Sequence, residues 1–444
     1  MSKIIPEFPG GTVMYPPGTM IPRLAMFTAI RDVFDRFGFS PIETPVLQKE
    51  LVLTGGDEHM RVFKINEESR TNSARALRFD LTVPLSVYVA MNTGTLSLPF
   101  KRSEIGPVFR PETAQRGRYN QFYQCDIDIA GVESGVADAE IIAVMVATLK
   151  ALSVQNFMIR INNRKILNAL PDFVGFDPAI NADVLRILDK LDKIGSDGVR
   201  KELQSNRKTK LSNEQCGTIE TFLSIKDRDP KKVLSVLEVL IGNSEIGKQG
   251  IAELHEILSY LPSFGVTEES FVIDLSVARG LGYYTGIVFE TTLTDIPEIG
   301  SVFSGGRYDD LIDRFGSRVP AVGASVGIDR LFTALETLGL ISKQKTVTKI
   351  LVLNIFEEAK NKSIELITAL RKSGISADLY MGKETGMGAQ LGYANSLDIT
   401  FVVIIGEDEF NKQIAIIKDM KNKEQIKKPL DHLVGHFVNF CKIS

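Results

Sequence analysis

The sequence is poor in cysteine, has no tryptophan and contains no long apolar run. The three cysteines, Cys125, Cys216 and Cys441, lie far apart and form no Cys-x-x-Cys pair, so we expect neither a disulfide framework nor a zinc site. The longest strongly apolar run, 401–405, is much shorter than the ~20 residues that cross a bilayer. The first residues also lack the apolar stretch of a signal peptide. These absences predict a cytoplasmic protein in a reducing compartment.

An excess of charge of either sign is also absent. The 52 lysines and arginines stand against 55 aspartates and glutamates, which gives a net charge of −3 and no overall attraction to nucleic acid or to an anionic membrane. The hydrophobic fraction of 44% and the charged fraction of 24% are those of an ordinary globular protein. No Gly-x-x-x-x-Gly-Lys-[Ser/Thr] loop is present, which excludes a P-loop nucleotide site. No Gly-x-Ser-x-Gly elbow supports hydrolysis by a serine nucleophile.

The length and a change of pattern along the chain predict the domain organisation. At ~100–200 residues per domain, two to four domains are expected. A polar stretch at 342–349 divides the chain into a domain of residues 1–345 and a domain of residues 346–444. Residues 165–265 are rich in Lys and Asp and helical by period, so we expect a helical insertion within the first domain. The second domain alternates strand and helix, which predicts an α/β unit with some parallel pairing: strands at 350–355, 376–380 and 399–405, and helices at 358–373 and 384–395.

The N-terminal region begins with a stretch rich in proline and glycine, 8–18, which predicts an extended arm. Apolar residues then recur at helical spacing from 21 to 37, and Gly38 ends the predicted helix. We predict one strand over 39–47, and this strand contains Pro45. Because proline cannot donate a hydrogen bond to a neighbouring strand, we expect it at a sheet edge or an interface.

The strongest local signal is an arginine-rich hairpin at 109–128. Arg110, Arg116 and Arg118 flank a glycine, and the alternation of apolar residues that follows predicts a second strand with a polar row. The pattern places one arginine at the end of the first strand. Arginine presents a rigid fork of donors that matches phosphate oxygens, and the nearby Phe122 offers a stacking surface for a base. A solvated basic hairpin with no ligand is the alternative.

Three other segments combine glycine, arginine or carboxylate in patterns that suit a ligand. Residues 277–286 place Arg279 and two tyrosines among three glycines, although a Gly-rich turn with packed tyrosines is about as consistent. In 321–330 a strand of small residues precedes a helix with Arg330 in its first turn; we attribute its glycines to close packing of sheet and helix, and a surface salt bridge is the alternative for the arginine. In 77–84 we expect Asp80 and Thr82 on one face of an extended segment, which suits an ammonium group, although a lone Asp is usually solvated.

These segments, in this order, resemble the three signature motifs of class II aminoacyl-tRNA synthetases. The helix and the Pro45 strand resemble motif 1, Phe109-Arg-Pro-Glu112 with its hairpin resembles motif 2, and 323–330 resembles motif 3. Arg279-Gly-Leu-Gly-Tyr-Tyr-Thr-Gly286 and Ser304-Gly-Gly-Arg-Tyr-Asp309 resemble signatures of the histidyl-tRNA synthetase family. The resemblance covers nearly the whole chain. It implies an α+β fold: an antiparallel-sheet catalytic core with a helical insertion, and a C-terminal α/β anticodon-binding domain.

The resemblance also implies an activity and its partners. The expected reaction is ATP-dependent activation of histidine to histidyl-adenylate, with Mg²⁺, followed by transfer to the 3′ end of tRNA(His). The expected assembly is a homodimer through the motif 1 region, including Pro45. A non-catalytic paralogue that senses histidine or tRNA, of the type of the ATP phosphoribosyltransferase regulatory subunit, is the alternative. A related ligase acting on another acceptor is a third possibility, which the C-terminal domain disfavours.

The resemblance assigns roles residue by residue. The three arginines that act on the reacting groups would be Arg279, Arg110 and Arg330. Histidine would be bound by Asp80, Thr82, Gln124, Asp128, Tyr283 and Tyr284. ATP would be bound by Arg110, Glu112, Arg118, Phe122 and Arg330. No metal ligands are assigned. Lysines of the C-terminal domain would add to the arginines of 110–118 as local basic contacts for tRNA: Lys418, Lys421, Lys423, Lys427 and Lys428.

Three positions depart from the family pattern. Gly282 stands where an acidic residue usually precedes the paired tyrosines. Val13-Met14 replaces the Arg-Asp pair that normally follows Gly-Thr. Asn120 occupies a position of the motif 2 strand that often carries a charged or basic residue. The positions that would contact the nucleotide and histidine are unchanged.

Overall fold

A computed structural model describes residues 5–57, 60–65, 74–113, 115, 117–278 and 282–443. They form two compact units, each considered by itself below. One holds Phe27–Leu340 with the N-terminal residues up to Val13, and the other holds Ile341–Ser444 with Met14–Met26. Within the described residues, no helix has the length and apolar character needed to span a membrane.

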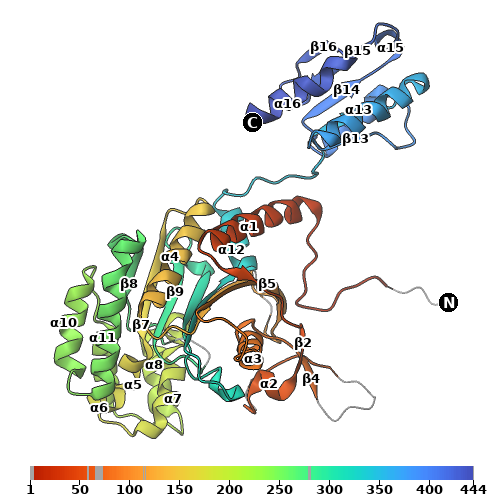
Figure 1. The fold of residues 1–444 in the computed structure, drawn as a ribbon. Coiled ribbons are helices and arrows are strands. Elements are labelled where there is room, and N and C mark those ends of the chain that lie inside the picture. Colours follow the sequence, from red (N-terminus) through yellow and green to blue (C-terminus); the bar gives the residue numbers. More distant parts are fainter. Residues whose placement is uncertain are drawn as a thin grey trace. The chain divides into compact units, whose positions relative to one another are not determined.

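An eight-stranded sheet forms the centre of the first unit (Figure 1). Its order is β1-β5-β6-β11-β10-β9-β7-β8; the outermost pairs are parallel and the pairs between them are antiparallel. The strands are β1 (Ser40–Pro41), β5 (Phe100–Phe109), β6 (Gln121–Ala130), β7 (Phe157–Asn163), β8 (Phe271–Ile273), β9 (Ile287–Leu293), β10 (Phe303–Arg307) and β11 (Ala321–Gly327). The sheet confirms the antiparallel core that the resemblance implies.

The β5–β6 hairpin gives this sheet one polar face and one apolar face. Its register runs from Phe100 opposite Ala130 to Phe109 opposite Gln121. Because successive side chains of a strand point to opposite faces, the odd-numbered residues of β6, such as Ile127, share a face with Arg307 of β10. Arg307 is ion-paired with Asp138 of helix α4 (Val136–Ala151), so α4 covers the apolar face. The even-numbered residues of β6 line the other face.

Residues 164–270, between β7 and β8, consist of helices and turns without a strand, as the period of the sequence predicts. Asn163 begins this segment as the N-cap of its first helix, where its side chain accepts a hydrogen bond from the Lys165 N–H. The helices are α5 (Arg164–Asn168), α6 (Leu170–Val174), α7 (Asn181–Leu188), α8 (Leu191–Ser205), α9 (Asn213–Leu223), α10 (Pro230–Ile241) and α11 (Glu245–Tyr260).

The prediction of one strand over 39–47 is wrong. The segment forms β1, which pairs with β5, and then bends; β2 (Leu47–Lys49) joins a separate three-stranded sheet with β3 (Lys64–Ile65) and β4 (Arg75–Leu77). Pro41 and Pro45 lack an N–H and fix φ, so a continuous ladder across both is unfavourable. Helix α1 (Pro17–Arg36) begins before the predicted start at 21, and only its residues from Phe27 onward belong to this unit. The unit's remaining α-helices are α2 (Glu50–Thr54), α3 (Thr82–Met91) and α12 (Ile328–Thr337).

The second unit is an α/β layer structure around a five-stranded sheet of order β13-β12-β14-β15-β16. The first three strands are parallel and the last two join antiparallel, which confirms the predicted alternation with some parallel pairing. The strands are β12 (Ile350–Val352), β13 (Ala377–Leu379), β14 (Phe401–Ile404), β15 (Ile414–Asp419) and β16 (Gln425–Pro429); the helices are α13 (Lys360–Lys372), α14 (Met387–Ser396), α15 (Glu407–Asn411) and α16 (Leu433–Ile443).

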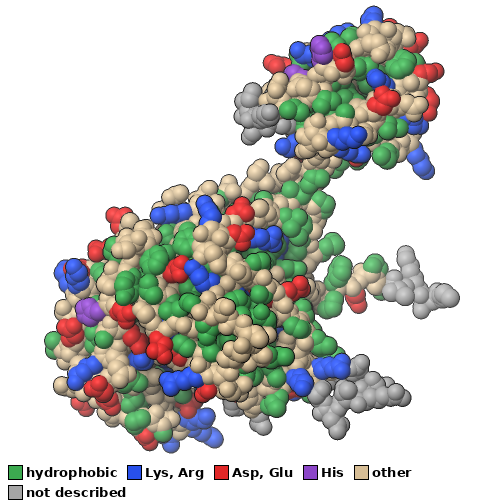
Figure 2. Space-filling model, viewed as in Figure 1, with side chains coloured by type: hydrophobic (Ala, Val, Ile, Leu, Met, Phe, Trp, Pro, Cys, Tyr) green, Lys and Arg blue, Asp and Glu red, His purple; other side chains and the backbone are tan. Residues whose placement is uncertain are grey.

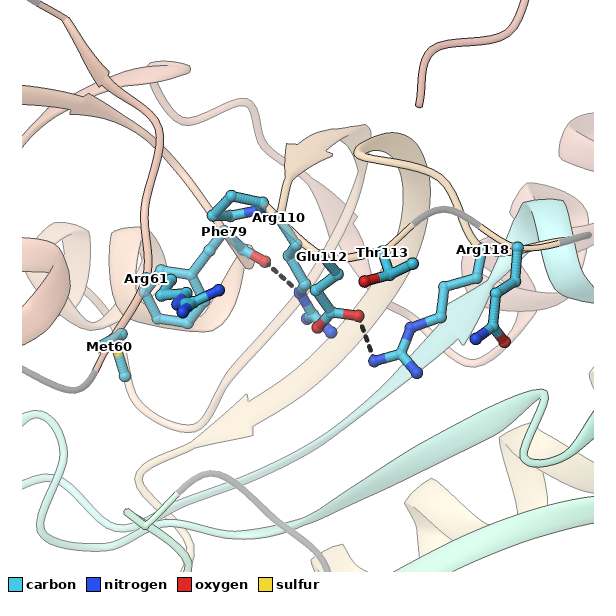
Figure 3. Close-up of a pocket in the computed structure, with 9 residues that line it drawn as sticks. Met60, Arg61, Phe79, Arg110, Glu112, Thr113 and Arg118 are labelled. Carbon is cyan, nitrogen blue, oxygen red and sulfur yellow. Dashed lines mark hydrogen bonds and ion pairs between the residues drawn. The ribbon is translucent and has the colours of Figure 1, made fainter. Parts of the chain in front are cut away.

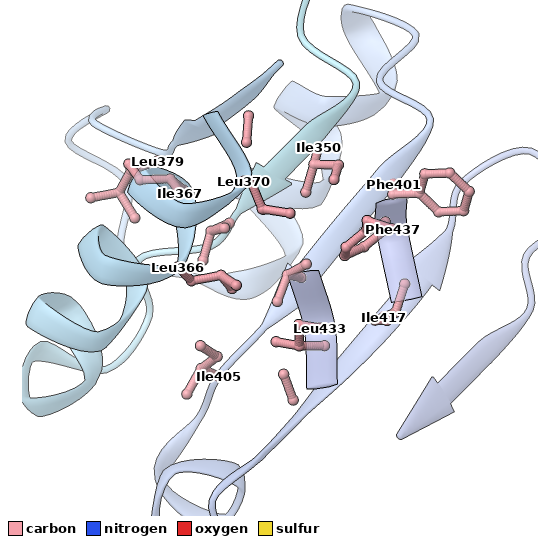
Figure 4. Close-up of a cluster of buried hydrophobic side chains, with 14 of the residues drawn as sticks. Ile350, Leu366, Ile367, Leu370, Leu379, Phe401, Ile405, Ile417, Leu433 and Phe437 are labelled. Atoms are coloured by element: carbon pink, nitrogen blue, oxygen red, sulfur yellow. The ribbon is translucent and has the colours of Figure 1, made fainter. Parts of the chain in front are cut away.

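The core of the second unit is built on both faces of that sheet. Ile350 of β12 packs with Leu370 of α13 and Phe437 of α16 on one face (Figure 4). The neighbouring residue Leu351 points to the other face and packs with Ala394 of α14. This alternation explains why β12 is apolar at every position, as expected for a strand covered on both sides.

Candidate active site

Two adjoining cavities open where the motif 2 hairpin turns. The larger, of about 670 Å³, is shown in Figure 3 and is lined by Met60, Arg61, Phe79, Arg110, Pro111, Glu112, Thr113, Gln115 and Arg118. The smaller, of about 160 Å³, is lined by Arg110, Glu112, Gly117, Arg118, Phe122, Gln124, Ser301, Val302, Ser304, Ser325, Gly327, Asp329 and Arg330. Arg110, Glu112 and Arg118 line both, so the cavities form one continuous candidate site.

Backbone and side-chain contacts hold Arg110 at the end of β5, where the hairpin loop begins. It directly follows β5, and its N–H donates to the Asn120 carbonyl at 2.8 Å, which closes the two strands. Its Nε donates to the Phe79 carbonyl at 2.9 Å, drawn as a dashed line in Figure 3. Its guanidinium carbon lies 5.2 Å from the centre of the Phe122 ring. The arginine that the sequence predicts at the strand end therefore lines both cavities.

Glu112 and Arg118 form an ion pair across the loop that the hairpin makes (Figure 3). Gly117 between them adopts a left-handed backbone with φ of 73°, which lets the loop turn back so that Gln115 and Arg118 pair as a β-bridge. The loop thus presents a carboxylate and a guanidinium to the same cavity. Arg116 lies outside the described residues.

Arg330 lies more than 200 residues after the motif 2 hairpin in the sequence, yet it lines the same small cavity. It is the third residue of α12, which follows β11 without a loop, and its Nη1 donates to the Ser301 carbonyl at 2.6 Å. Asp329 beside it accepts a hydrogen bond from the Tyr123 N–H at 3.1 Å, which ties α12 to β6. Strand pairing of β6 with β11 therefore brings the predicted motif 2 and motif 3 arginines together.

Asp80 and Tyr283 meet in a buried cluster next to these cavities. The Tyr283 hydroxyl donates to Asp80 Oδ2 at 3.4 Å, and the Val83 N–H donates to Oδ1 at 3.1 Å. Burial raises the pKa of Asp80 to about 6, although the hydrogen bond from Val83 and the charge of Arg110 oppose the rise. The predicted extended segment is wrong here, because Thr82 begins α3 and the Asp80 carboxyl group accepts a hydrogen bond from the Val83 N–H in the first turn of that helix.

The even-numbered residues of β6 supply the polar row that the sequence predicts. Gln124 Nε2 donates to the Ser325 hydroxyl at 2.6 Å. Asp128 is buried, ion-paired through Oδ2 with Arg102 Nη2 at 2.8 Å, and accepts a hydrogen bond at Oδ1 from the Tyr308 hydroxyl. Burial is the main cause that raises the pKa of Asp128, and the charge of Arg102 opposes it.

Gly323 on β11 makes room for Asp128. A Cβ at this position would lie 1.9 Å from Asp128 Oδ1 and 2.7 Å from the Ile127 carbonyl oxygen. We attribute this glycine, from the sequence, to sheet–helix packing, but the structure shows that it accommodates a carboxylate from the neighbouring strand.

The two tyrosines predicted to close the histidine pocket lie together, with ring centres 4.9 Å apart. Burial raises the pKa of Tyr283 and the pKa of Tyr284 well above the usual range, so both hydroxyls stay protonated and able to donate. Arg279, the residue expected between the two substrates, lies outside the described residues.

The motifs do not single out several residues that the structure adds to the site: Arg102, Glu104, Asp126, Tyr308 and Ser325. Asp126 lies between Gln124 and Asp128 on the same face of β6, and burial raises its pKa to about 8. The period of two along β6 was a signal that could have found it. Tyr308 belongs to the quoted segment 304–309, but nothing local indicates that it bonds Asp128.

The departures from the family pattern fall in two different environments. A Cβ at Gly282 would meet no atom within 4 Å, so the position has room for a side chain. The Asn120 N–H donates to the Gly11 carbonyl at 2.8 Å, and Gly11 has φ of 79°. Asn120 therefore fastens the N-terminal arm to the motif 2 hairpin, while Val13 and Met14 are exposed.

Comparisons with known proteins agree along both parts of the chain. The sequence model described as Histidyl-tRNA synthetase matches residues 17–331, and the one described as Anticodon binding domain matches residues 349–439. A histidine–tRNA ligase of Wolinella succinogenes is 42% identical over 405 residues, 90% of each chain. One of Clostridium tetani is 39% identical over 417 residues, 92% of each chain. The crystal structure of histidyl-tRNA synthetase from Nostoc sp. PCC 7120 has a TM-score of 0.86 at 33% identity and covers 98% of this chain and 99% of that chain.

Proposed function

The chain belongs to the histidyl-tRNA synthetase family, and on that premise we propose how it acts as a histidine–tRNA ligase. The meeting of Arg110 and Arg330 at one cavity, beside the buried Asp80 and the polar row of β6, is the observation that carries the proposal. The site offers cationic forks for a triphosphate on one side and carboxyl groups for an amino acid on the other.

In the first step a carboxylate oxygen of histidine attacks the α-phosphorus of ATP. The new O–P bond replaces the bond to pyrophosphate, which leaves. No general base is needed because the nucleophile is already ionised, so catalysis comes from positioning and from charge stabilisation. In the second step a hydroxyl at the 3′ end of tRNA(His) attacks the acyl carbon of histidyl-adenylate, and AMP leaves.

ATP binding falls to the residues that line the small cavity. Arg110 binds the α-phosphate, and Arg330, which lines the same cavity, binds the terminal phosphates. Glu112 and Arg118, which are ion-paired in the hairpin loop, bind the adenine end of ATP. The Phe122 ring provides a face on which the base can stack. Arg279 would lie between the histidine carboxylate and the α-phosphate; its role remains a prediction because the residue lies outside the described part of the chain.

Histidine binding falls to the buried cluster. Asp80 takes the α-ammonium group, with Thr82 beside it at the start of α3. Asp128 and Gln124 line the pocket below, and Tyr283 and Tyr284 close it around the ring. A pocket that hydrogen-bonds the ring discriminates against apolar amino acids far more strongly than one that only encloses it, because those analogues leave its polar groups unpaired.

Mg²⁺ fits this site as a companion of ATP rather than as a resident ion. Among the described residues, no group of three or more potential ligands converges on a metal position. Mg²⁺ is usually held by substrate phosphates and one or two carboxylates, and Glu112 and Asp329 are the carboxylates that line the small cavity. When bound, the ion would neutralise phosphate charge.

The anticodon end of tRNA is assigned to the second unit. We place the catalytic domain at 1–345, with the insertion at 165–265, and the anticodon-binding domain at 346–444. The proposed basic contacts lie on the β15–β16 hairpin: Lys418, Lys421, Lys423, Lys427 and Lys428. We further propose a homodimer through the motif 1 region around Pro45, and a cytoplasmic location.

Histidine-dependent exchange of pyrophosphate into ATP tests the first step, and charging of a tRNA with the histidine anticodon tests the second. Both activities are expected, with no exchange when another amino acid replaces histidine. Exchange without charging would contradict the ligase function and favour a paralogue that senses histidine. Absence of exchange would overturn the site assignment as a whole.

A further inference from the structure

Asp126 is a buried carboxyl group beside the histidine pocket with an unused acceptor atom. Its side chain is 2% exposed, and its Oδ1 has no hydrogen-bond partner in the described part of the chain. The Ser325 hydroxyl is hydrogen-bonded to the Asp126 carboxyl group. The same hydroxyl accepts a hydrogen bond from Gln124 Nε2. A buried acceptor without a partner lowers stability, so it requires an explanation.

The position of Asp126 on β6 places it under the proposed substrate. Gln124, Asp126 and Asp128 share one face of the strand, and Gln124 lines the small cavity together with Ser325, the residue paired with Asp126 on β11. With a rise of ~3.3 Å per residue, Gln124 and Asp128 are ~13 Å apart along the strand. A ligand that contacts the side chains of both Gln124 and Asp128 therefore lies over Asp126, which stands between them on the same face of the strand.

Acceptor atoms in the polar row of β6 that lack a hydrogen-bond partner favour a ligand with several hydrogen-bond donors. Gln124 Oε1 is also buried without a hydrogen-bond partner among the residues described. Asp128 Oδ2 also lacks a hydrogen-bond partner among those residues, although it is ion-paired with Arg102, and Asp128 Oδ1 already accepts from the Tyr308 hydroxyl. Histidine carries an ammonium group and a ring N–H, which are the donors that these acceptors lack.

Charged and polar groups face Asp126 from several elements. Arg102 and Glu104 lie on β5, Asp128 on β6 and Ser325 on β11, while Asp80 precedes α3 and Tyr284 precedes β9. Arg102 attracts the ionised form, and the neighbouring carboxyl groups repel it. A cation entering this cluster would relieve that repulsion.

We propose that Asp126 is a further specificity-determining residue, whose Oδ1 accepts a hydrogen bond from an N–H of the bound histidine and whose negative charge strengthens that bond. This inference rests on the proposed function. Asp126 binds the substrate directly, in contrast to Arg102 and Tyr308, which position Asp128.

The proposal predicts a pH dependence that a purely structural carboxyl group would not produce. Because the pKa of Asp126 is raised to about 8 in the free protein, the binding form becomes more abundant as the pH rises. The parameter kcat/KM for histidine reports groups of the free enzyme. The substrate also titrates, but its contribution cancels in the ratio of wild type to Asp126→Asn.

The experiment is histidine-dependent ATP–pyrophosphate exchange by wild type and Asp126→Asn across this range. Asn keeps the shape and an acceptor but cannot ionise. The ratio of the two kcat/KM values is expected to rise about tenfold between about pH 7 and about pH 9, as expected for one ionisation. The KM for histidine of the variant is expected to exceed that of wild type at least about tenfold at the upper pH, with the KM for ATP unchanged. A flat ratio overturns the proposal.

A second variant keeps the test decisive if Asp126→Asn does not fold. Ser325→Ala removes the hydroxyl that lowers the pKa of Asp126, so the rise of kcat/KM should move to higher pH. Asp138→Asn is the matched control: this buried carboxylate binds Arg307 on the other face of the sheet, and its loss should lower the melting temperature without moving the rise. A rise that stays in place in Ser325→Ala contradicts the role of Asp126, whereas a wild type without exchange contradicts the proposed function instead.

Discussion

The arginine and aspartate side chains assigned to this site are held in fixed positions, and the contacts that hold them come from several separate segments of the chain. Arg110 is oriented by the Phe79 carbonyl and by the Phe122 ring. Asp128 is oriented by Arg102 and Tyr308. Preorganised charges stabilise a transition state without reorganising as the charge develops, so these contacts matter as much as the groups they hold.

Arg279→Ala tests the residue assigned to the charge that develops during histidine attack. By analogy with the loss of one oxyanion donor, adenylate formation should slow roughly 10²–10³-fold, with a smaller change in the KM for either substrate. Single-turnover formation of adenylate and ATP–pyrophosphate exchange measure this effect. A near-normal exchange rate would remove Arg279 from the proposed mechanism.

Asp126 also predicts how stability depends on pH. Its pKa is about 8 in the folded protein and ordinarily ~3.9 in an unfolded chain. Between these values the folded state holds a proton that the unfolded state has released, so the contribution of Asp126 to stability is complete at low pH and is lost as the pH rises through the folded pKa. Asp126→Asn should therefore gain melting temperature relative to wild type as the pH rises from about 5 to about 8. Calorimetry without ligand measures this difference, and a difference that does not change with pH would contradict the buried, protonated state.

At the scale of secondary-structure elements, the site depends on the close approach of β6 and β11. The carboxylate of Asp128 occupies the space above Gly323, its partner on β11. Gln124, at the other end of the polar row of β6, is paired with Gly327 at the end of β11. The two glycines lie on the same strand but differ in their surroundings. A Cβ at Gly327 would have its nearest contact at 3.9 Å, from the Val302 carbonyl oxygen.

Gly323→Ala should therefore destabilise the fold and weaken histidine binding together. The added methyl would displace Asp128 from Arg102 and Tyr308 and lower the free energy of unfolding by about 1–3 kcal/mol. Gly327→Ala is the control for stability and should change that free energy by no more than about 0.5 kcal/mol. Denaturant unfolding compares the two variants. Equal effects would show that the Asp128 contact is not what requires glycine.

Local patterns predicted most elements, because period and capping are properties of neighbouring residues. The hairpin, the helix after β11 and the helices between β7 and β8 were found in this way. The segment 39–47 was not, because its two halves pair with different sheets and those partners lie far along the chain. The same reason hides the contact of Tyr308 with Asp128. The glycine at 323 was visible in the sequence, but the side chain that requires it was not.

At the scale of the whole molecule, net charge was a poor guide to the partner. On the face shown in Figure 2, acidic and basic side chains are interspersed, which agrees with the near balance in composition. The basic residues assigned to tRNA are local, on the motif 2 loop and on the β15–β16 hairpin. A protein can bind nucleic acid through such patches because screening limits each charge to its surroundings.

The proposed dimer makes a prediction for the apolar residues around the motif 1 region. Leu47 on β2 is 42% exposed and Leu51 on α2 is 72% exposed, beside the bend at Pro45. Exposed apolar side chains that lie close together mark contact surfaces, and a charge placed there would have to be buried in the dimer. Leu51→Asp should therefore shift the protein from dimer to monomer while the unfolding of the monomer stays cooperative.

Sedimentation velocity at several protein concentrations measures this shift. Val239→Asp is the matched control, because Val239 is 81% exposed on helix α10 of the insertion, apart from the motif 1 region. The control should keep the mass of the wild type, since its new charge remains in water. A Leu51→Asp protein that sediments as the wild-type dimer would place the interface elsewhere. A monomeric wild type that still charges tRNA would show that the reaction needs one chain only.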